Sequence, residues 1–285
     1  MEQLFVINAS GQPEPFSFRK VFASAKRSGA SNKVATEIAL DIRDSLSPGE
    51  KTKDIFQKVK TMLLEHDFTS GVRFNLKEAI RRLGPSGFPF EKYVASIYEK
   101  MGYQVDLNKK IRGKCIVHEI DFVAKKEKEV IIGECKYRIS PGDRVDVKNA
   151  LATHATFLDL HDGTYFKNFA GCEFKNILVT NAKFTTQAIK YAKCVGMDLL
   201  GWRHPTRGGL EHMIESNMFY PITILPSFRG LVTNLLSTQN KVLIDDILKV
   251  DPVKLANDTG IQKERLLPLI EEAKTLLELK SIHHE

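Results

Sequence analysis

The stretch that most constrains the fold of this chain runs from Val117 to Arg138 and reads VHEIDFVAKKEKEVIIGECKYR. Two apolar-rich runs, Ile116 to Ala124 and Glu129 to Tyr137, flank the polar run Lys125 to Lys128, which is the pattern of a β-hairpin. Within the second run, Val130 to Gly133 is almost entirely apolar. This composition indicates a central strand that is buried on both faces.

Charged side chains are expected to gather on one side of this hairpin. Because side chains alternate along a strand, Glu119 and Asp121 share one face of the first strand, and Glu134 and Lys136 share one face of the second. The opposite side is expected to carry the apolar residues Ile120, Phe122, Ile132 and Cys135. Gly133 is expected to leave room for close approach of a ligand to the backbone.

Three carboxylates and one ammonium group on the same side indicate either a metal site or a solvated surface. Carboxylates a few Å apart repel each other by about 4 kcal/mol at an effective dielectric constant of about 20, and a divalent cation removes that repulsion. Oxygen ligands suit Mg²⁺ or Mn²⁺ better than Zn²⁺. A metal held by Asp121 and Glu134, with Lys136 orienting a water molecule, would favour phosphodiester hydrolysis. The alternative is an amphipathic hairpin whose polar face is simply solvated.

Several ordered segments around this hairpin resemble the Mrr-like branch of the PD-(D/E)xK nucleases. Asp121 followed by Glu134-Cys135-Lys136 matches the Asp…Glu-x-Lys signature, and Phe90-Glu91…Met101-Gly102-Tyr103 matches the preceding helix. The strand and helix that close the domain match in Ile177 to Thr185, followed by Ala188, Tyr191, Ala192 and Gly196. The resemblance covers about Gly87 to Trp202 and implies a Mg²⁺-dependent or Mn²⁺-dependent DNA endonuclease. It also implies that Glu91 is a further carboxylate of the metal site; the alternative is an acid placed favourably against the helix dipole.

Residues 1–84 are expected to form a separate unit. The predicted elements are strands at Leu4 to Ile7 and through Glu14 to Phe16, and helices at Phe18 to Ser28, Ser31 to Leu46, Thr52 to His66 and Gly71 to Leu83. Their order resembles the ATP-cone, a regulatory nucleotide-binding domain, with matches at Val6, Gly11, Pro15-Phe16, Arg19-Lys20 and Thr52. The resemblance implies ATP or dATP as an effector near Arg19, Lys20 and Thr52. Ile7-Asn8 stands where the family has a basic pair, so a packing or dimerisation unit, and hence a homo-oligomer, stays open.

The remaining segments complete a three-part chain. Residues 88–202 are expected to form the nuclease domain, and its further elements are a helix from Asp146 to His161, a loop from Asp159 to Phe169, a strand from Phe174 to Thr180, a helix from Thr185 to Val195 and a strand from Met197 to Trp202. Within that domain, Lys148, His154 and Thr156 are candidates to face phosphate or the metal. Residues 210–280 resemble a helix-hairpin-helix bundle, helical from Ser227 onward, and the turn Thr259 to Lys263 is expected to meet DNA phosphates or a protein partner.

Composition restricts the setting of this activity. The formal net charge of +7 is compatible with DNA as a partner, and no apolar run approaches the roughly 20 residues that cross a membrane. The beginning of the chain has no secretory signal pattern, so we expect a cytoplasmic protein with no membrane partner.

The predicted fold is therefore α/β. It consists of a restriction-endonuclease-like mixed sheet flanked by helices, a small, mostly helical N-terminal ATP-cone and a C-terminal helical bundle. The predicted function is that of a metal-dependent DNA endonuclease in restriction or defence, with possible control by ATP or dATP. Two alternatives stay open. One is a nucleotide-responsive DNA-binding protein with an inactive nuclease scaffold, and the other is a repair or recombination nuclease.

Overall fold

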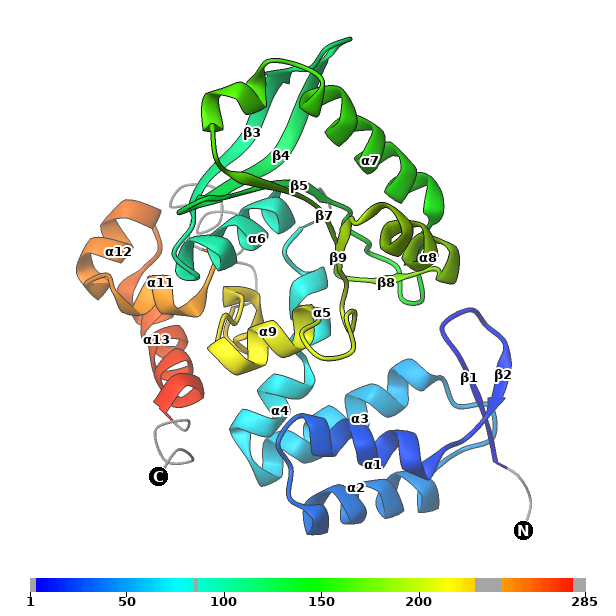
Figure 1. Ribbon diagram of the computed structural model, residues 1–285. Coiled ribbons are helices and arrows are strands. Elements are labelled where there is room, and N and C mark those ends of the chain that lie inside the picture. The colour runs from blue at the N-terminus through cyan, green and yellow to red at the C-terminus, as the bar shows by residue number, and fades with distance from the viewer. Residues whose placement is uncertain (1–3, 85–86, 229–241, 279–285) are drawn as a thin grey trace.

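The computed structural model describes residues 4–84, 87–228 and 242–278. A group of helices with a small hairpin is formed by the N-terminal residues, a sheet with helices on both faces occupies the middle of the chain, and further helices follow (Figure 1). The mixed α/β character and the sheet flanked by helices confirm that part of the predicted fold.

The N-terminal elements follow the predicted order. They are the antiparallel strands β1 (Phe5–Ile7) and β2 (Pro13–Pro15) and the helices α1 (Phe18–Arg27), α2 (Asn32–Asp44) and α3 (Thr52–His66). The side chain of Asn8 closes the hairpin turn by accepting backbone hydrogen bonds from Ser10 and Gln12, both at 3.0 Å. Ser17 and Ser31 cap α1 and α2 by accepting hydrogen bonds from backbone N–H groups of the first turn, as capping serines commonly do. A compact core of small and aliphatic residues joins these elements.

The single helix expected from Gly71 to Leu83 is wrong, because the segment forms two helices. These are α4 (Phe68–Phe74) and α5 (Leu76–Arg81), and Asn75 ends the first and begins the second. Asn75 is buried, and asparagine favours helix ends because its side chain competes with the backbone for hydrogen bonds. Apolar residues of this segment, including Leu76, Ile80 and Leu83, pack in the core that also contains the sheet, not in the N-terminal core.

The main sheet has five strands in the order β3-β4-β5-β7-β9. They are β3 (Gln104–Arg112), β4 (Val117–Lys126), β5 (Glu129–Cys135), β7 (Glu173–Val179) and β9 (Asp198–Leu200). β4 pairs antiparallel with β3 and β5, whereas β7 pairs parallel with β5 and β9. The predicted hairpin is therefore confirmed, and β5 is the central strand. The strand β3 was not predicted, because its mostly polar residues do not have the apolar pattern of a buried strand.

Helices cover both faces of this sheet. On one face α6 (Phe88–Lys100) packs against Phe122, Ala124 and Ile131. On the other face lie α7 (Val147–His161), α8 (Thr186–Val195) and the 3-10 helix η1 (Tyr165–Phe169). The loop expected from Asp159 to Phe169 is thus partly wrong, because Phe166 of η1 stacks on Phe174 of β7 at 3.8 Å between ring centroids and orders the segment. A short parallel pair, β6 (Arg144–Val145) and β8 (Lys183–Phe184), lies directly before the first residues of α7 and α8.

Two details predicted for the hairpin are wrong. Ile120 and Ile132 pack toward α7 and η1, whereas Phe122 and Cys135 pack in the core with α6, so these four residues do not share a face. Gly133 does not leave space for a ligand either. A Cβ atom at this position would lie 2.1 Å from the ring of Phe122, so the glycine accommodates an aromatic side chain of the neighbouring strand.

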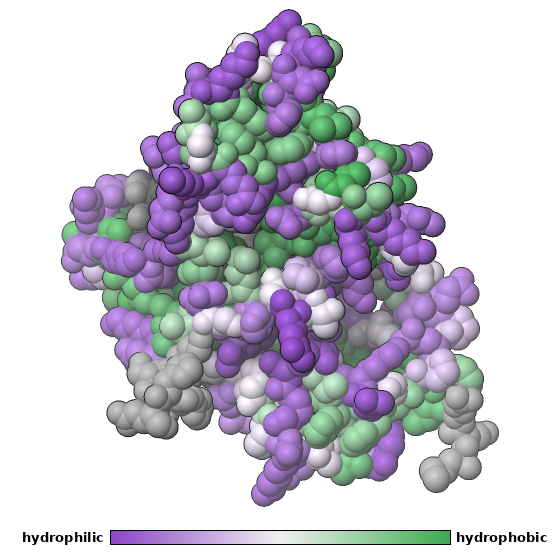
Figure 2. Space-filling view, viewed as in Figure 1, coloured by the Kyte–Doolittle hydropathy of each residue, from purple (hydrophilic) through white to green (hydrophobic). Residues whose placement is uncertain are grey.

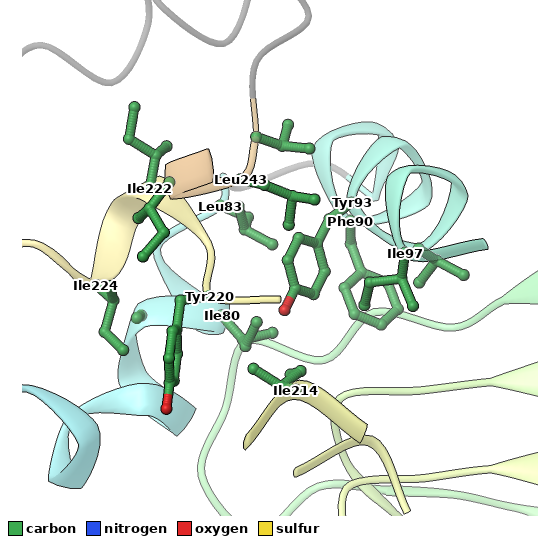
Figure 3. Packing of buried hydrophobic residues seen from close by; sticks show 14 of the residues in the cluster. Ile80, Leu83, Phe90, Tyr93, Ile97, Ile214, Tyr220, Ile222, Ile224 and Leu243 are labelled. Carbon is green, nitrogen blue, oxygen red and sulfur yellow. The ribbon is translucent and has the colours of Figure 1, made fainter. Parts of the chain in front are cut away.

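The C-terminal helices share a core with α5 and α6. The elements are α9 (Leu210–Asn217), η2 (Ile222–Ile224), α11 (Ile244–Leu248), α12 (Pro252–Thr259) and α13 (Lys263–Glu278). Figure 3 shows Ile80, Tyr93, Tyr220 and Leu243 packed around one centre. The hydroxyl of Tyr93 in α6 donates to the carbonyl of Phe219 at 2.7 Å, which ties this part of the chain to the sheet domain. The continuous helical character predicted from Ser227 falls partly on residues 229–241, outside the described residues.

The visible surface is predominantly hydrophilic. Figure 2 shows charged and polar residues over most of this face, with apolar patches between them. In the described part of the chain, no helix is both long enough and apolar enough to cross a membrane.

Candidate active site

The candidate site lies where the pairing between β4 and β5 ends. The last paired residues are Phe122 and Gly133, so Asp121 and Glu134 come next on the two strands. Beyond this pair the backbone N–H of Cys135 donates to Oδ2 of Asp121 at 2.7 Å. The side chain of Asp121 thus replaces a backbone carbonyl as the hydrogen-bond acceptor at this point. The bond holds the Asp121 carboxylate beside the end of β5.

Lys136 lies next to these carboxylates. Its Nζ donates to Oε1 of Glu134 at 2.5 Å, and the two side chains are 34% and 24% exposed, respectively. The structure therefore brings together the predicted residues Asp121, Glu134 and Lys136, and solvent still reaches them. Sequence pattern alone predicted this grouping from the alternation of side chains along two neighbouring strands.

The electrostatics of the site show an excess of negative charge. Burial first, and the charge of Glu134 second, raise the pKa of Asp121 to about 7, against the hydrogen bond from Cys135. Burial acts to lower the pKa of Lys136, but the hydrogen bond and charge of Glu134 outweigh it, and the pKa is raised. Lys136 therefore stays cationic at neutral pH. A cation that binds beside Asp121 would favour the ionised form of its carboxyl group and displace the proton.

Glu91 lies in the first turn of α6, near the carboxylates. Burial first, and then the charge of Glu134, raise the pKa of Glu91, so the charges of the two acids interact. Among the residues that the structure describes, however, no group of three or more His, Cys, Asp or Glu side chains is arranged to hold a metal ion. The geometry thus places Glu91 at the edge of the site without grouping it with Asp121 and Glu134 as a third ligand.

A groove of about 480 Å³ runs from Glu134 and Lys136 to α7. It is lined by residues of both strands and of the helix: Glu119, Glu134, Lys136, Asp146, Lys148, Asn149, Ala152, Thr153 and Thr156. The predicted residues Lys148 and Thr156 therefore face the same space as Glu134. His154 does not line the groove, because its Nδ1 is paired with the hydroxyl of Tyr191 on α8 at 2.7 Å.

Two polar residues to which the sequence pattern gave no role hold the segment after β5 in place. The hydroxyl of Thr180 donates to the carbonyl of Lys136 at 2.5 Å, and the amide side chain of Asn181 bonds both the N–H and the carbonyl of Arg138 at 2.8 Å. Both residues are buried. A Thr-Asn pair directly after an apolar strand was the available signal, since buried polar groups usually have a hydrogen-bonding task.

The residues predicted to bind a nucleotide are not grouped in one cavity. Thr52, the first residue of α3, lines a cavity of about 770 Å³ next to the β1–β2 turn. Arg19 and Lys20 lie on α1 outside the residues that line it, and Lys20 is paired with Glu14 at 3.4 Å. The predicted DNA-contacting turn does form between α12 and α13, where Gly260 has a φ of 67° and Ile261 is buried.

Comparison with known proteins identifies the family to which the sheet domain is similar. The family model Mrr_cat, described as a restriction endonuclease, matches residues 83–201. A protein of Archaeoglobus fulgidus described as uncharacterized is 32% identical over 184 residues, which are 65% of this chain and 99% of that protein. A crystal structure of a protein of unknown function is also 32% identical, with a TM-score of 0.57, and covers 68% of this chain and 99% of that one.

A more distant structure was found as well. Can2 from Sulfobacillus thermosulfidooxidans, in complex with cyclic tetra-adenylate, aligns at 14% identity with a TM-score of 0.31 over 75% of this chain and 69% of that one. This similarity is too low to support any argument about the present chain.

Proposed function

Because residues 83–201 of this chain belong to the Mrr-type restriction endonuclease family of the PD-(D/E)xK superfamily, we propose that the protein is a metal-dependent endonuclease that hydrolyses DNA phosphodiester bonds. The observation that carries the proposal is the meeting of Asp121, Glu134 and Lys136 where the pairing between β4 and β5 ends. A groove between this strand end and α7 offers the space for a DNA strand.

The donor set fits a hard divalent cation. Mg²⁺ is commonly held by one or two carboxylates, while water and substrate phosphate fill its other positions, so two acids suffice. Asp121 and Glu134 would hold Mg²⁺ or Mn²⁺, and the raised pKa of Asp121 fits a site that lacks one positive charge. When bound, the metal would polarise the phosphodiester and make a water molecule more acidic.

The side chains of this chain have separate tasks in the proposed reaction. Lys136, held by Glu134, orients the attacking water and stabilises negative charge that develops on the phosphate. Lys148 and Thr156 lie across the groove on α7, where an ammonium group and a hydroxyl bind phosphate oxygens. Thr180 fixes the backbone of Lys136 and thereby limits the positions that the ammonium group can reach.

The finer parts of the proposal concern regulation, DNA contacts and setting. We also propose that residues 1–84 form an ATP-cone-like unit that takes ATP or dATP, and that the turn between α12 and α13 contacts DNA. Thr52 lines a large cavity, which supports the first of these, whereas the positions of Arg19 and Lys20 do not. We infer a role in restriction or defence from the family to which residues 83–201 belong.

The experiment that tests the function compares DNA substrates for the purified protein. Supercoiled plasmid, linear duplex and a four-way junction are incubated with Mg²⁺, with Mn²⁺ or with a chelator. Metal-dependent cutting of plasmid supports a restriction-type endonuclease, and a strong preference for the junction supports a repair or recombination nuclease instead. If all three substrates bind and stay intact with either metal, the nuclease proposal fails and the domain is a DNA-binding scaffold.

A further inference from the structure

The hairpin of β3 and β4 continues beyond the catalytic groove as residues 110–120, the hairpin end. Figure 1 shows it at the top of the molecule, beside the end of α7 that leads into η1. Its register is continuous, with Lys110 opposite Glu119 and Arg112 opposite Val117. Directly opposite residues of an antiparallel pair share a face, as do alternate residues of one strand. These four residues therefore share one face, and Glu119 connects that face to the groove, which it lines.

The other face of the hairpin end is covered. Ile111 and Ile120 are buried there against residues of α7 and η1. On the same side, Nε2 of His118 is paired with Oδ2 of Asp159 in α7 at 2.7 Å. By contrast, the four residues of the first face are all exposed. The hairpin end thus presents one open face to solvent, directly next to the catalytic groove.

Asp159 holds the closed end of the hairpin in place. Its carboxylate accepts hydrogen bonds from the backbone N–H groups of Cys115 at 2.8 Å and Ile116 at 3.3 Å, and its carbonyl accepts one from the N–H of Lys114 at 2.9 Å. Asp159 follows Thr156 of the groove by three residues, so it continues the same side of α7. A surface that is ordered in advance loses little conformational entropy when a partner binds.

The hairpin end carries basic and apolar side chains that lack partners within the chain. In the described part of the chain no ion pair involves Lys110 or Arg112, whereas the two other basic residues between positions 109 and 114 have acidic partners. Ile116 and Val117 are 58% and 53% exposed, although aliphatic side chains of this size are usually buried. Free cations beside exposed aliphatic groups suit a partner that alternates phosphates with apolar surface.

We propose that the open face of the hairpin end is a contact surface for duplex DNA beside the bond that is cut. Lys110 and Arg112 bind phosphates, while Ile116 and Val117 pack against deoxyribose carbons. At about 3.3 Å per residue, the two cations lie roughly 7 and 13 Å along the hairpin from Asp121. DNA therefore extends from the groove along the hairpin. This inference deepens the proposed nuclease function and takes DNA as the partner from it.

The composition of the hairpin end favours duplex over single-stranded DNA. Proteins that bind single strands commonly stack the bases on aromatic rings. The segment from Lys110 to Val117 contains no aromatic residue. Phosphate and sugar contacts carry no sequence information directly. The surface is thus expected to raise the affinity for any duplex without adding a sequence preference.

Binding is tested apart from cleavage, by fluorescence anisotropy of a labelled duplex with the full chain, in a chelator or with Ca²⁺ in place of Mg²⁺. A salt series gives the slope of log K against log salt, which changes by about 0.9 for each phosphate contact. For Lys110→Gln/Arg112→Gln we expect a slope shallower by about 2 and affinity at low salt reduced by about tenfold or more.

The apolar part of the surface is tested with Ile116→Thr/Val117→Thr. This variant removes apolar contact and no charge, so we expect affinity to fall by about threefold or more at every salt concentration, with an unchanged slope. Wild-type affinity in this variant would refute the packing of Ile116 and Val117 on DNA.

Lys190→Gln/Lys193→Gln is the matched control for the basic pair. Both lysines are exposed residues of α8, which packs beside β9 at the other edge of the sheet. The variant removes two positive charges from the same domain and thereby tests whether net charge alone explains the effect. We expect its slope and affinity to match those of the wild type.

Four results would overturn the proposal. One is a wild-type slope and affinity in Lys110→Gln/Arg112→Gln, and another is an equal loss in the lysine control. The third is tighter binding of a single strand than of the duplex by the wild type, and the fourth is the absence of DNA binding by the wild type in either buffer.

Cleavage separates a failure of this surface from a failure of the nuclease proposal. In Mg²⁺, Lys110→Gln/Arg112→Gln should raise the KM for plasmid and keep kcat, because the two side chains bind DNA away from the reacting atoms. A wild-type KM in this variant would refute the surface and leave the nuclease proposal standing. A wild type that binds duplex as expected but cuts nothing would refute the nuclease proposal and leave the contact surface standing.

Discussion

Oδ2 of Asp121 accepts a hydrogen bond from the backbone N–H of Cys135 at 2.7 Å, across the end of the β4–β5 ladder. The bond fixes one carboxylate oxygen beside β5, which carries Glu134 and is directly followed by Lys136, and leaves the other oxygen for a cation. An asparagine in place of Asp121 would accept the same bond through its amide oxygen, whereas an alanine would not.

Asp121→Asn and Asp121→Ala are therefore expected to differ in stability but to share the loss of metal binding. Thermal unfolding with Mg²⁺ and with a chelator measures both effects. The wild type gains stability from Mg²⁺ and neither variant does, while Asp121→Ala also loses about 1–3 kcal/mol because the Cys135 N–H has no acceptor. A Mg²⁺-induced stabilisation that survives in Asp121→Asn would contradict the assignment of Asp121 as a ligand.

Gly133→Ala should destabilise the nuclease domain. The added Cβ would meet the Phe122 ring at 2.1 Å, and overpacking of this kind costs about 1–3 kcal/mol. Urea unfolding gives the free energy of each variant. Adding Phe122→Leu to Gly133→Ala should restore part of the loss relative to the sum of the single substitutions, and strict additivity would show that the ring contact is not the cause.

Asp159→Asn should make unfolding less sensitive to acid. The hydrogen bond from His118 at 2.7 Å is the main reason that the pKa of Asp159 lies well below its usual range. A depressed carboxyl pKa contributes stability above the unfolded-state pKa of about 4, and that stability is lost as the pH falls below it. Melting curves of the two proteins should thus differ most at neutral pH and converge in acid.

Asp162→Asn serves as the matched control for that series. Asp162 is exposed and lies directly after the end of α7, 3.5 Å from Lys114. Its substitution should shift the melting temperature much less. Equal effects of the two substitutions would mean that the His118–Asp159 pair has no special role.

His154→Gln should leave DNA cleavage intact. His154 is paired with Tyr191 of α8 and does not line the catalytic groove. Loss of this hydrogen bond is expected to cost about 0.5–1.5 kcal/mol, and Tyr191→Phe should cost a similar amount. A large fall in the single-turnover cleavage rate of His154→Gln, with stability preserved, would show that His154 takes part in cleavage.

Local pattern was sufficient to predict the hairpin and the meeting of its charged residues. Alternation along two neighbouring strands places Asp121, Glu134 and Lys136 together without knowledge of the rest of the fold. The strand β3 was missed because its polar residues give no apolar period, and it is ordered by pairing with β4. Such pairing is a tertiary effect that a single segment does not encode.

Other parts required contacts between distant residues. The role of Gly133 depends on the ring of Phe122, and that of His154 depends on Tyr191 of another helix. The cavity lined by Lys77 and Ile139 joins segments that are far apart in the sequence. Helix and strand periodicity predicts which face of an element is buried, but not which partner covers it.

The most direct test of the central claim is the single-turnover rate of plasmid cleavage in Mg²⁺ for the wild type, Asp121→Asn, Lys136→Met and Asp106→Asn. Asp106 pairs with Lys109 at 2.6 Å on the exposed strand β3, so its variant controls for the loss of one carboxylate. We expect the first two variants to be slower than the wild type by at least about 100-fold and the control to match it. Wild-type rates in Lys136→Met and Asp121→Asn would show that this site does not cut DNA.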